Sequence, residues 1–465
     1  MSAKSTDSKK YRILLLTNCH SDNVGDQVIE ATDIALIKAA MSNLGVAEDG
    51  FEIKSTDAGI ISKKYVETKD TSLLANAYRL IEWCDVVFFG GAPQFNYLYQ
   101  IFYERTATII DIADSLGKTV VFSSIGIESY DESDARCIRL KKAVNSDNVK
   151  RITTRDGFHL LEQYKSRPDL YIEKVADPAV FTNWVFSDYL NASHNGKASN
   201  KDLKKVGLFI IRAGAFTSNG IPFSWRKAAK MWLEIIRELE QRGIDYELIT
   251  SGHYGDEAFL DRLIRDYNVP SSKCVFGVSN PETLVSRISS YEAVLSCRLH
   301  PSIISYSLRV PAISLVWNPK VQGFYEGIGY SERALDVTAS SPAEIVKSLV
   351  TAFEAGVSHD REYMMSVYTN IFYALRDSLG IISAEDVEVF SFDELTSVIP
   401  HYPGTSAEEQ RRKDIRKLRR TYEKFNDRTD ELGALRKENK KLKARKPAKS
   451  PVRKALSKFK KLVFH

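Results

Sequence analysis

An arginine and a histidine, Arg298 and His300, stand directly after a short apolar run at residues 293–295. The run predicts a buried strand, and the apolar spacing across residues 303–308 predicts a helix after the turn. Both side chains then fall at the carboxyl end of a strand, where open α/β sheets bind ligands. A guanidinium suits phosphate or carboxylate, an imidazole exchanges protons near neutral pH, and a helix N-terminus adds backbone donors for an anion. The two residues therefore predict a site for a small anionic substrate that is protonated or deprotonated during reaction.

Two further cations occupy equivalent places in the sequence. Arg212 follows the apolar run 206–211, and Lys320 follows the run 312–316, so both can reach the same anion. Each assignment has a structural alternative. Arg212 would form a surface salt bridge, and Lys320 would begin a helix on a solvated face. In the same alternative, Arg298 would pair with a carboxylate, and the histidine beside it would cap the helix.

A loop near the N-terminus supplies a carboxyl group that could exchange protons. Asn23, Gly25 and Asp26 follow a predicted strand at 13–16 and precede a predicted helix at about 27–41. Asp26 is either a base or the N-cap of that helix, and the two roles are compatible. The glycine permits close approach of another group to the backbone.

Two glycines, Gly90 and Gly91, follow a predicted buried strand at 86–89. They allow a sugar or a phosphate to approach the backbone, or they form a plain tight turn. His20 lies in the N-terminal loop and is a further candidate for sugar binding, with a structural role as the alternative.

Alternating strand and helix patterns surround these residues in two stretches of chain. They predict mainly parallel sheets covered by helices, separated by a polar segment without apolar periodicity. The predicted fold class is α/β, with two Rossmann-like domains facing each other across a cleft and a helical, basic C-terminal tail. The expected division is a disordered N-terminus at 1–10, an acceptor domain at 11–186, a linker at 187–205, an anion-binding domain at 206–358, a returning helix and connector at 359–403, a charged helix or coiled coil at 404–446, and a basic amphipathic tail at 447–465.

The composition is that of an ordinary globular protein of 465 residues, with 43% hydrophobic and 27% charged residues. The N-terminus has no apolar signal core, and no run is long enough to predict a transmembrane helix. The five cysteines are scattered without a CxxC pair, which argues against zinc and against a disulfide framework. We therefore expect a protein of the reducing cytoplasm, and we expect no metal site.

The charge is divided unevenly along the chain. Residues 411–465 hold 22 Lys/Arg and 6 Asp/Glu, whereas the preceding 410 residues hold 43 basic and 54 acidic side chains. The segment 404–446 is either a short coiled coil or a lone solvated helix. The segment 447–465 has an apolar and a basic face, which is typical of a helix on an anionic membrane, although a disordered basic tail is the alternative. Nucleic acid is not an expected partner, because no base-reading element accompanies the tail.

Several short motifs, in this order, resemble the polysaccharide pyruvyl transferase family. Their order and spacing over about residues 11–330 make the resemblance specific, although each motif alone is weak. The family often has a longer glycine run where this chain has Ala92-Pro93, which weighs against a phosphate-cradling role there. The motifs are Asn23-Val24-Gly25-Asp26, Gly90-Gly91, Ser124-Ile125-Gly126-Ile127, Thr154-Arg155-Asp156, Ala176-Asp177-Pro178-Ala179, Cys297-Arg298-Leu299-His300 and Asn318-Pro319-Lys320.

The resemblance implies a GT-B-like fold and transfer of a pyruvate ketal from phosphoenolpyruvate to two hydroxyls of a sugar, on a surface polysaccharide or a lipid-linked precursor. The methylene carbon of phosphoenolpyruvate must gain a proton, so the chemistry needs a general acid and positive charge but no cofactor. It implies His300, Arg298 and Asp26 as catalytic residues. Phosphoenolpyruvate binding is implied for Arg212, Arg298, Leu299, His300 and Lys320. Acceptor binding is implied for Asn23, Gly25, Asp26, Gly90 and Gly91, whereas Arg155 and Asp177 are expected to hold their domain together.

Other interpretations stay open. One is a GT-B glycosyltransferase that uses a nucleotide sugar, for which only Glu326 is a weak candidate for the acid that grips a ribose. Another is a non-catalytic assembly protein recruited through its tail. In the leading interpretation the enzyme lies peripherally on the inner membrane face, and homo-oligomerisation is left open.

Overall fold

The computed structural model describes residues 10–98, 101–191, 202–381, 384 and 386–444. These residues form two compact units that divide between residues 406 and 407. The N-terminus predicted to be disordered lies outside the described residues except for its last position. The predicted membrane-binding tail at 447–465 and most of the predicted linker also lie outside them.

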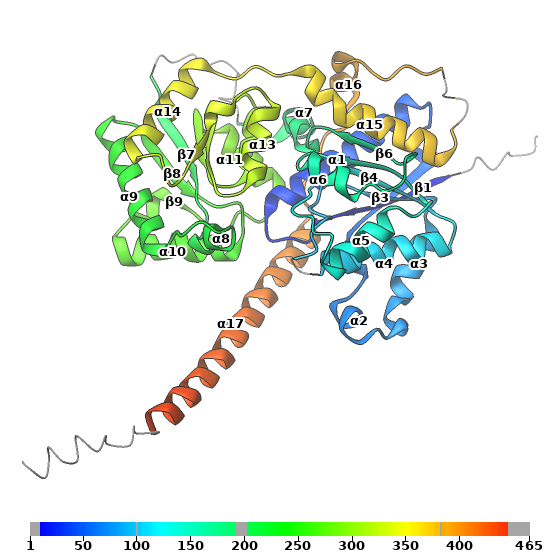
Figure 1. The fold of residues 1–465 in the computed structure, drawn as a ribbon. Coiled ribbons are helices and arrows are strands. Elements are labelled where there is room, and N and C mark those ends of the chain that lie inside the picture. Colours follow the sequence, from blue (N-terminus) through cyan, green and yellow to red (C-terminus); the bar gives the residue numbers. More distant parts are fainter. Residues whose placement is uncertain (1–9, 99–100, 192–201, 382–383, 385, 445–465) are drawn as a thin grey trace, which may run out of the picture. The chain divides into compact units, whose positions relative to one another are not determined.

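The first unit contains two six-stranded sheets, and every strand pair in them is parallel (Figure 1). We call the parts built around these sheets the first and second lobes. The first sheet has the order β2-β1-β3-β4-β5-β6, and the second has the order β12-β11-β10-β7-β8-β9. The predicted α/β class with two Rossmann-like domains is therefore confirmed. The strands are β1 (Tyr11–Thr17), β2 (Phe51–Asp57), β3 (Val86–Phe89), β4 (Thr119–Ile125), β5 (Val149–Thr154), β6 (Tyr171–Lys174), β7 (Lys205–Phe209), β8 (Asp245–Ile249), β9 (Cys274–Val275), β10 (Ala293–Ser296), β11 (Ala312–Val316) and β12 (Ala334–Asp336).

Helices follow most strands, as the alternating pattern predicts. In the first lobe they are α1 (Val24–Asn43), α2 (Lys63–Thr68), α3 (Ala75–Trp83), α4 (Phe102–Ser115), α5 (Ala135–Val144), α6 (Phe158–Tyr164) and α7 (Thr182–Val185). The remaining helices are α8 (Ala213–Ser218), α9 (Trp225–Gln241), α10 (Tyr254–Tyr267), α11 (Pro281–Ser289), α12 (Leu299–Ser307), α13 (Pro319–Gly327), α14 (Pro342–Ala355), α15 (Arg361–Leu379), α16 (Phe392–Val398) and α17 (Ala407–Ala444).

The central strands are buried on both faces because their side chains alternate between two cores. In β1, Ile13 and Leu15 face one apolar cluster, whereas Leu14 and Leu16 face another. The cluster that contains Ile13 is shared by the two lobes, since it also includes side chains of α1, α11, α12 and α15. Helix α15 comes after the second lobe in the chain but packs on α1, β4 and β5 of the first. The shared cluster thus fixes the start of α1 against the start of α12.

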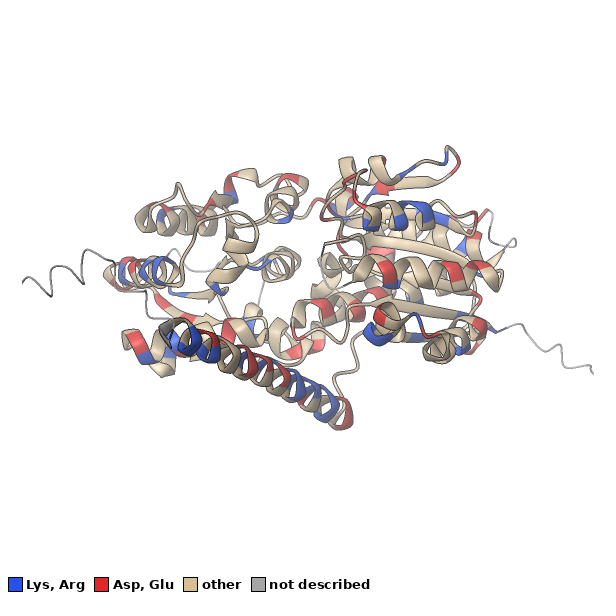
Figure 2. Cartoon of the chain, turned by 60° about the horizontal axis from the view of Figure 1, so that its bottom comes forward, with Lys and Arg blue, Asp and Glu red and all other residues tan. Residues whose placement is uncertain are grey.

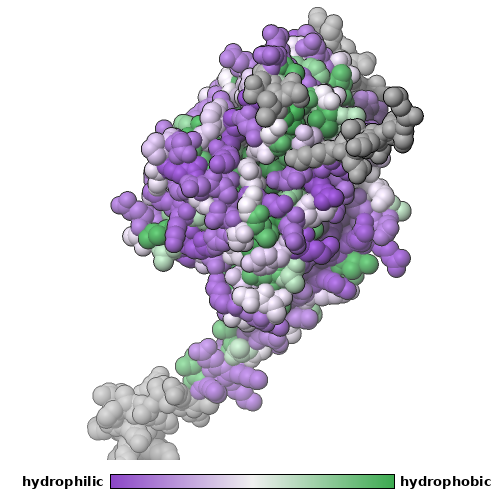
Figure 3. Space-filling view, turned by 90° about the vertical axis from the view of Figure 1, so that its right-hand side faces the viewer, coloured by the Kyte–Doolittle hydropathy of each residue, from purple (hydrophilic) through white to green (hydrophobic). Residues whose placement is uncertain are grey.

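The surface of the first unit is polar where Figure 3 shows it, with hydrophobic residues only scattered among hydrophilic ones. The second unit contains α17, a helix of 38 residues along which basic and acidic residues intermingle (Figure 2). Several of its apolar side chains are exposed, at 415, 418, 422, 425, 432, 435 and 442. The helical expectation is met here, but the coiled coil stays a prediction. Among the described residues, no helix combines the length and apolarity that crossing a bilayer requires.

Candidate active site

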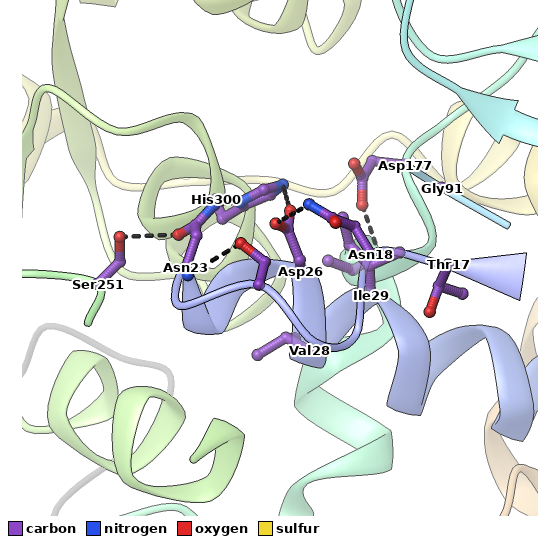
Figure 4. A network of polar contacts seen from close by, with 12 residues as sticks. Thr17, Asn18, Asn23, Asp26, Val28, Ile29, Gly91, Asp177, Ser251 and His300 are labelled. Carbon is purple, nitrogen blue, oxygen red and sulfur yellow. Dashed lines mark hydrogen bonds and ion pairs between the residues drawn. The ribbon is translucent and has the colours of Figure 1, made fainter. Parts of the chain in front are cut away.

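The site forms where the strand order of each sheet reverses. In the first sheet this point lies between β1 and β3, and in the second it lies between β7 and β10. Ligands of open α/β sheets bind at the carboxyl ends of the strands at such points. The loop to α1 follows β1, and the turn to α12 follows β10, so the first turns of two helices from different lobes meet here (Figure 4).

Asn23 joins the two lobes through both ends of its side-chain amide. Its Nδ2 lies 3.1 Å from Nδ1 of His300, and its Oδ1 accepts a hydrogen bond of 2.9 Å from Oγ of Ser251 (Figure 4). The backbone N–H of Val24 also donates to the carbonyl oxygen of Ser251, at 2.8 Å. Since Ser251 follows β8 of the second lobe, this loop of the first lobe is bonded to the second lobe at two residues, His300 and Ser251.

His300 is buried and neutral. Because the amide nitrogen of Asn23 donates to Nδ1, the proton of the imidazole is on Nε2. This Nε2 lies 3.8 Å from Oδ1 of Asp26 and has no hydrogen-bond partner among the described residues. Burial, followed by three nearby positive charges, lowers the pKa of His300 well below its usual value. The three charges belong to Arg155, Arg298 and Lys320. A buried N–H without a partner, close to cations, suits one oxygen of an anionic ligand.

Asp26 is also buried, in the first turn of α1, and its Oδ2 accepts a hydrogen bond of 2.8 Å from Nδ2 of Asn18. Burial raises the pKa of Asp26 to about 6, although hydrogen bonds from Ser21 and Asn18 and the charges of Arg155 and Arg298 oppose the rise. The facing imidazole is neutral, so the two groups carry at most one charge between them. A carboxyl that changes its protonation state near neutral pH is suited to general acid–base catalysis.

Gly25 is a point of close contact between the two lobes. A Cβ atom at this position would lie 2.3 Å from both Cβ and Nδ1 of His300. No side chain larger than hydrogen fits there unless the imidazole moves. The glycine that the sequence suggested for close approach therefore admits a side chain of the other lobe.

Asp256 brings the two predicted arginines of the second lobe together. It is fully buried in the first turn of α10. Its Oδ2 accepts from Nε of Arg298 at 2.9 Å, and its Oδ1 accepts from the backbone N–H of Arg212 at 3.0 Å and from Nη1 of that residue at 3.4 Å. Burial alone would raise the pKa of Asp256, but the charge of Arg298, then those of His253 and Arg212, hold it below its usual value. One ionised carboxylate thus orients both guanidinium groups.

Each arginine keeps donors that its carboxylate partner does not use. Within the described part of the chain, Nη1 of Arg298 and both Nε and Nη2 of Arg212 have no hydrogen-bond partner. The side chain of Arg298 is 14% exposed and that of Arg212 is 39% exposed. These donors are available to a second anion beside Asp256.

Lys320 reaches from the start of α13 to the first lobe, where its Nζ pairs with Glu128, three residues beyond β4. Its side chain is 14% exposed. Leu299 is the first residue of α12, so its backbone N–H belongs to the turn that has no acceptor within the helix. Leu299 precedes His300 in the chain and the charge of Lys320 acts on the imidazole, so both residues can contribute to the same anion site.

Gly90 and Gly91 pack against the first lobe itself. The N–H of Gly90 donates to the carbonyl of residue 16, and that of Gly91 donates to Oδ2 of Asp33 at 3.2 Å. The carbonyl of Gly91 accepts from Nη1 of Arg155 at 2.7 Å, and the same nitrogen forms a buried ion pair with Asp177. Because these backbone donors are used internally, acceptor binding by the two glycines stays a prediction.

Comparison with known proteins identifies the family. A model of the family described as polysaccharide pyruvyl transferase matches residues 23–319, which is more than half of the chain. The chain belongs to the polysaccharide pyruvyl transferase family. A comparison with curated protein sequences found no significant match.

Solved structures show that this family member has a GT-B-like fold. Staphylococcus aureus MnaA, solved with UDP, is similar with a TM-score of 0.50 at 12% identity, over 80% of this chain and 98% of that one. A protein assigned as a UDP-N-acetylglucosamine 2-epimerase, from Listeria monocytogenes, has a TM-score of 0.50 at 10% identity, over 82% and 99% of the two chains. At these identities the likeness concerns the fold alone.

Several of the structural alternatives for the family's motif residues are wrong. Asp26 is not the N-cap of α1, because the helix begins at Val24 with Asn23 in the N-cap position. His300 does not cap α12, since that position belongs to Arg298. Lys320 does not lie on a solvated face. Arg212 and Arg298 do pair with a carboxylate, as the alternative predicted, but it is a buried one that they share.

Sequence reasoning missed Ser251, His253 and Asp256, which all follow β8. The signal was present: they stand after an apolar strand, at the same edge of the sheet as Arg212 and Arg298. Asp33, buried beside Gly91, was also missed, because a carboxylate in the middle of a helix gives no local signal. In the described part of the chain, no group of three or more His, Cys, Asp or Glu side chains is arranged to hold a metal ion.

Proposed function

We propose that this protein transfers a pyruvate ketal from phosphoenolpyruvate to two hydroxyls of a sugar in a surface polysaccharide or its lipid-linked precursor. The observation that carries the proposal is the meeting of His300 and Asp26 across the two lobes, with Arg298 and Lys320 close enough to the imidazole to lower its pKa. A proton-exchanging carboxyl beside clustered cations meets the two requirements of this reaction, which are a general acid and positive charge.

Phosphoenolpyruvate carries a phosphate and a carboxylate, and the second lobe offers separate donors for them. The guanidinium groups of Arg298 and Arg212 are both bonded to one carboxylate and keep further N–H donors. Two planar guanidinium groups suit two anionic groups of a ligand. Nε2–H of His300 and the N–H of Leu299 add neutral donors at the start of α12. Lys320 supports the same anion once its bond to Glu128 is exchanged for one to phosphate.

The proton steps follow from the pKa of Asp26. In its protonated form Asp26 gives its proton to the methylene carbon, which becomes the methyl group, while an acceptor hydroxyl loses its proton to a base and its oxygen bonds to the neighbouring carbon. Phosphate then leaves with the electron pair of its C–O bond. The carboxylate of Asp26 takes the proton of the second hydroxyl as that oxygen closes the ring, and the acid is restored.

The acceptor belongs to the first lobe in this proposal, at Asn23, Gly25 and Asp26. A lipid-linked acceptor is presented at the inner membrane face, so a basic tail that binds anionic lipid would hold the enzyme beside its substrate. This localisation rests on the sequence pattern of 447–465. Its test is sedimentation of the full chain with vesicles that contain phosphatidylglycerol, compared with a chain ending at residue 446.

The function is tested by phosphate release from phosphoenolpyruvate in the presence of a panel of p-nitrophenyl hexosides. We expect release with at least one hexoside and its loss in Arg298→Ala, whereas Arg265→Ala, an exposed arginine of the same lobe, keeps full activity. Phosphoenolpyruvate should also raise the melting temperature, because a ligand at 100 times its Kd stabilises by about 2.7 kcal/mol. Stabilisation by UDP or a UDP-sugar, together with indifference to phosphoenolpyruvate, would instead support a glycosyltransferase.

A further inference from the structure

A second histidine lies in the loop that carries Asn23 and Asp26, and it is paired with a carboxylate. Nδ1 of His20 lies 3.1 Å from Oδ2 of Asp57, and the two side chains are 32% and 27% exposed. Nε2 of His20 has no hydrogen-bond partner in the part of the chain that the structure describes. The pair therefore presents one ring nitrogen to its surroundings, while the other is held by the carboxylate.

Asp57 is fixed at both oxygens, so it can orient the imidazole. It is the last residue of β2, opposite Thr17 at the end of β1, and its Oδ1 accepts from the N–H of Gly59 at 2.9 Å. Burial would raise the pKa of Asp57, but the bond from His20 comes next and holds it below the usual value. An ionised carboxylate on Nδ1 keeps the proton on that nitrogen and leaves Nε2 with a free lone pair.

The surrounding charges preserve this arrangement. The guanidinium of Arg105 acts on Asp57 from α4, and the carboxylate of Glu30 acts on the adjacent thiol of Cys19 from α1. These two groups and Asp57 bring charge to this part of the loop, in which Asp22 is a further carboxylate. The positive charge favours the ionised form of Asp57, and the ionised carboxylate stabilises His20 when the imidazole takes up a proton.

His20 lies in the loop between two residues that bond to side chains of the candidate active site. Asn18, two residues before it, donates to Oδ2 of Asp26, and Asn23, three residues after it, bonds to His300. Since consecutive Cα atoms are 3.8 Å apart, the Cα atoms of His20 and Asn23 are separated by at most about 11 Å. The pair also stands at the carboxyl end of β1 and β2, the edge at which this lobe would receive its ligand.

We propose that His20 is the general base that removes the proton of the first acceptor hydroxyl, with Asp57 as its positioning residue; this rests on the proposed pyruvyl transfer. The hydroxyl proton moves to Nε2 of His20 as the oxygen bonds to the central carbon of phosphoenolpyruvate. Asp26 gives the methylene its proton and later takes that of the second hydroxyl. The proton on His20 leaves with the released phosphate, so the two hydroxyl protons end on the methyl group and on phosphate.

The test compares His20→Gln with His159→Gln, which changes an exposed histidine of the same lobe. The substrates are phosphoenolpyruvate and the p-nitrophenyl hexoside that the wild-type protein accepts. We expect His20→Gln to lower kcat by about 10²- to 10⁴-fold, the usual contribution of a general base. The melting temperature, its rise with phosphoenolpyruvate and the exchange of solvent deuterium into the methylene group should all persist. Asp57→Asn should lower kcat as well, and His159→Gln should behave as wild type.

The pH dependence gives an independent readout. The wild-type kcat/KM for the hexoside should fall at acidic pH, because the reaction needs an unprotonated base, and His20→Gln should lose this limb. Unchanged kcat in His20→Gln, or a rise in KM for the hexoside with kcat intact, overturns the assignment of a base while leaving pyruvyl transfer in place. Absence of phosphate release and of stabilisation by phosphoenolpyruvate in the wild-type protein overturns the proposed function, and this inference with it.

Discussion

Nδ2 of Asn23 and Nδ1 of His300 lie 3.1 Å apart, although 276 residues separate them in the chain and they belong to different lobes. The same amide accepts a hydrogen bond from Ser251 through Oδ1. One uncharged side chain thus sets the tautomer of the imidazole and ties together the loops after β1, β8 and β10. Its loss should affect chemistry more than stability.

Asn23→Ala should lower kcat/KM for phosphoenolpyruvate by about 10- to 100-fold, because His300 loses the bond that orients its ring. The free energy of unfolding should fall by only about 1–3 kcal/mol, the cost of leaving buried polar partners unsatisfied. Denaturant unfolding and initial rates measure the two effects. Asn76→Ala, at an exposed position on α3, is the control and should change neither.

Gly25→Ala should separate α1 from α12, since the new methyl group would overlap the imidazole of His300. We expect a loss of about 1–3 kcal/mol in stability and about 10²-fold in kcat/KM, because a shift of an ångström misplaces the reacting groups. The matched change Gly433→Ala in α17 should preserve activity, because the added methyl group would meet no atom within 4 Å apart from its chain neighbours and the backbone of its own helix. Normal activity in the Gly25 variant would contradict the close approach of the two lobes.

Asp26→Asn should change the pH dependence of stability. Burial raises the pKa of Asp26 to about 6 in the folded protein, whereas an unfolded aspartate titrates near 3.9. The folded state therefore binds this proton more tightly, and the stabilisation it gives is complete below about pH 4 and lost as the pH rises through about 6. An asparagine stays neutral, so the stability of the variant relative to wild type should increase by roughly 3 kcal/mol between pH 4 and pH 7.

That comparison is made by urea unfolding across the pH range, with Asp111→Asn as an exposed control. A difference between variant and wild type that does not depend on pH would show that Asp26 is charged throughout. In the activity assay Asp26→Asn should be inactive at every pH, because an amide can neither donate the proton nor accept it.

Asp177→Asn should destabilise the first lobe by about 3–5 kcal/mol, because it removes the carboxylate hydrogen-bonded to the buried guanidinium of Arg155, and the carboxylate of Asp156 lies farther away, at 3.6 Å from Nε. The exposed pair of Arg139 and Asp111 provides the comparison, and Asp111→Asn should cost less than about 1 kcal/mol. Chemical denaturation measures the free energy of unfolding of both variants. Equal effects at the two sites would mean that the buried pair contributes no more than a surface pair.

The sequence predicted the interior of both sheets but not their edges. The runs at 13–16, 86–89 and 293–295 are apolar throughout because those strands are covered on both faces. The strands missed were β2, β6, β9 and β12, which are the edge strands of the two sheets. They are short or mixed in polarity, as in Tyr171–Lys174, and edge positions do not demand an apolar pattern.

For the candidate site, the sequence predicted the position of residues along each strand but not their contacts in space. Spacing alone placed Arg212 and Arg298 at one edge of a sheet, since each follows a predicted strand. It did not reveal that Asp256 holds them both, because that contact depends on which strands are neighbours in space. The N-cap expectation for Asp26 failed because α1 begins at Val24, three residues before the predicted start, at a valine that the pattern assigned to the loop.

The hydrogen bond from Ser251 to Asn23 and the ion pair of Lys320 with Glu128 join the two lobes. If the protein uses phosphoenolpyruvate as proposed, the acid stands on one lobe and the imidazole and arginines on the other, so substrate held by the second lobe alone would have no proton donor. Separation of the lobes would then protect phosphoenolpyruvate from hydrolysis.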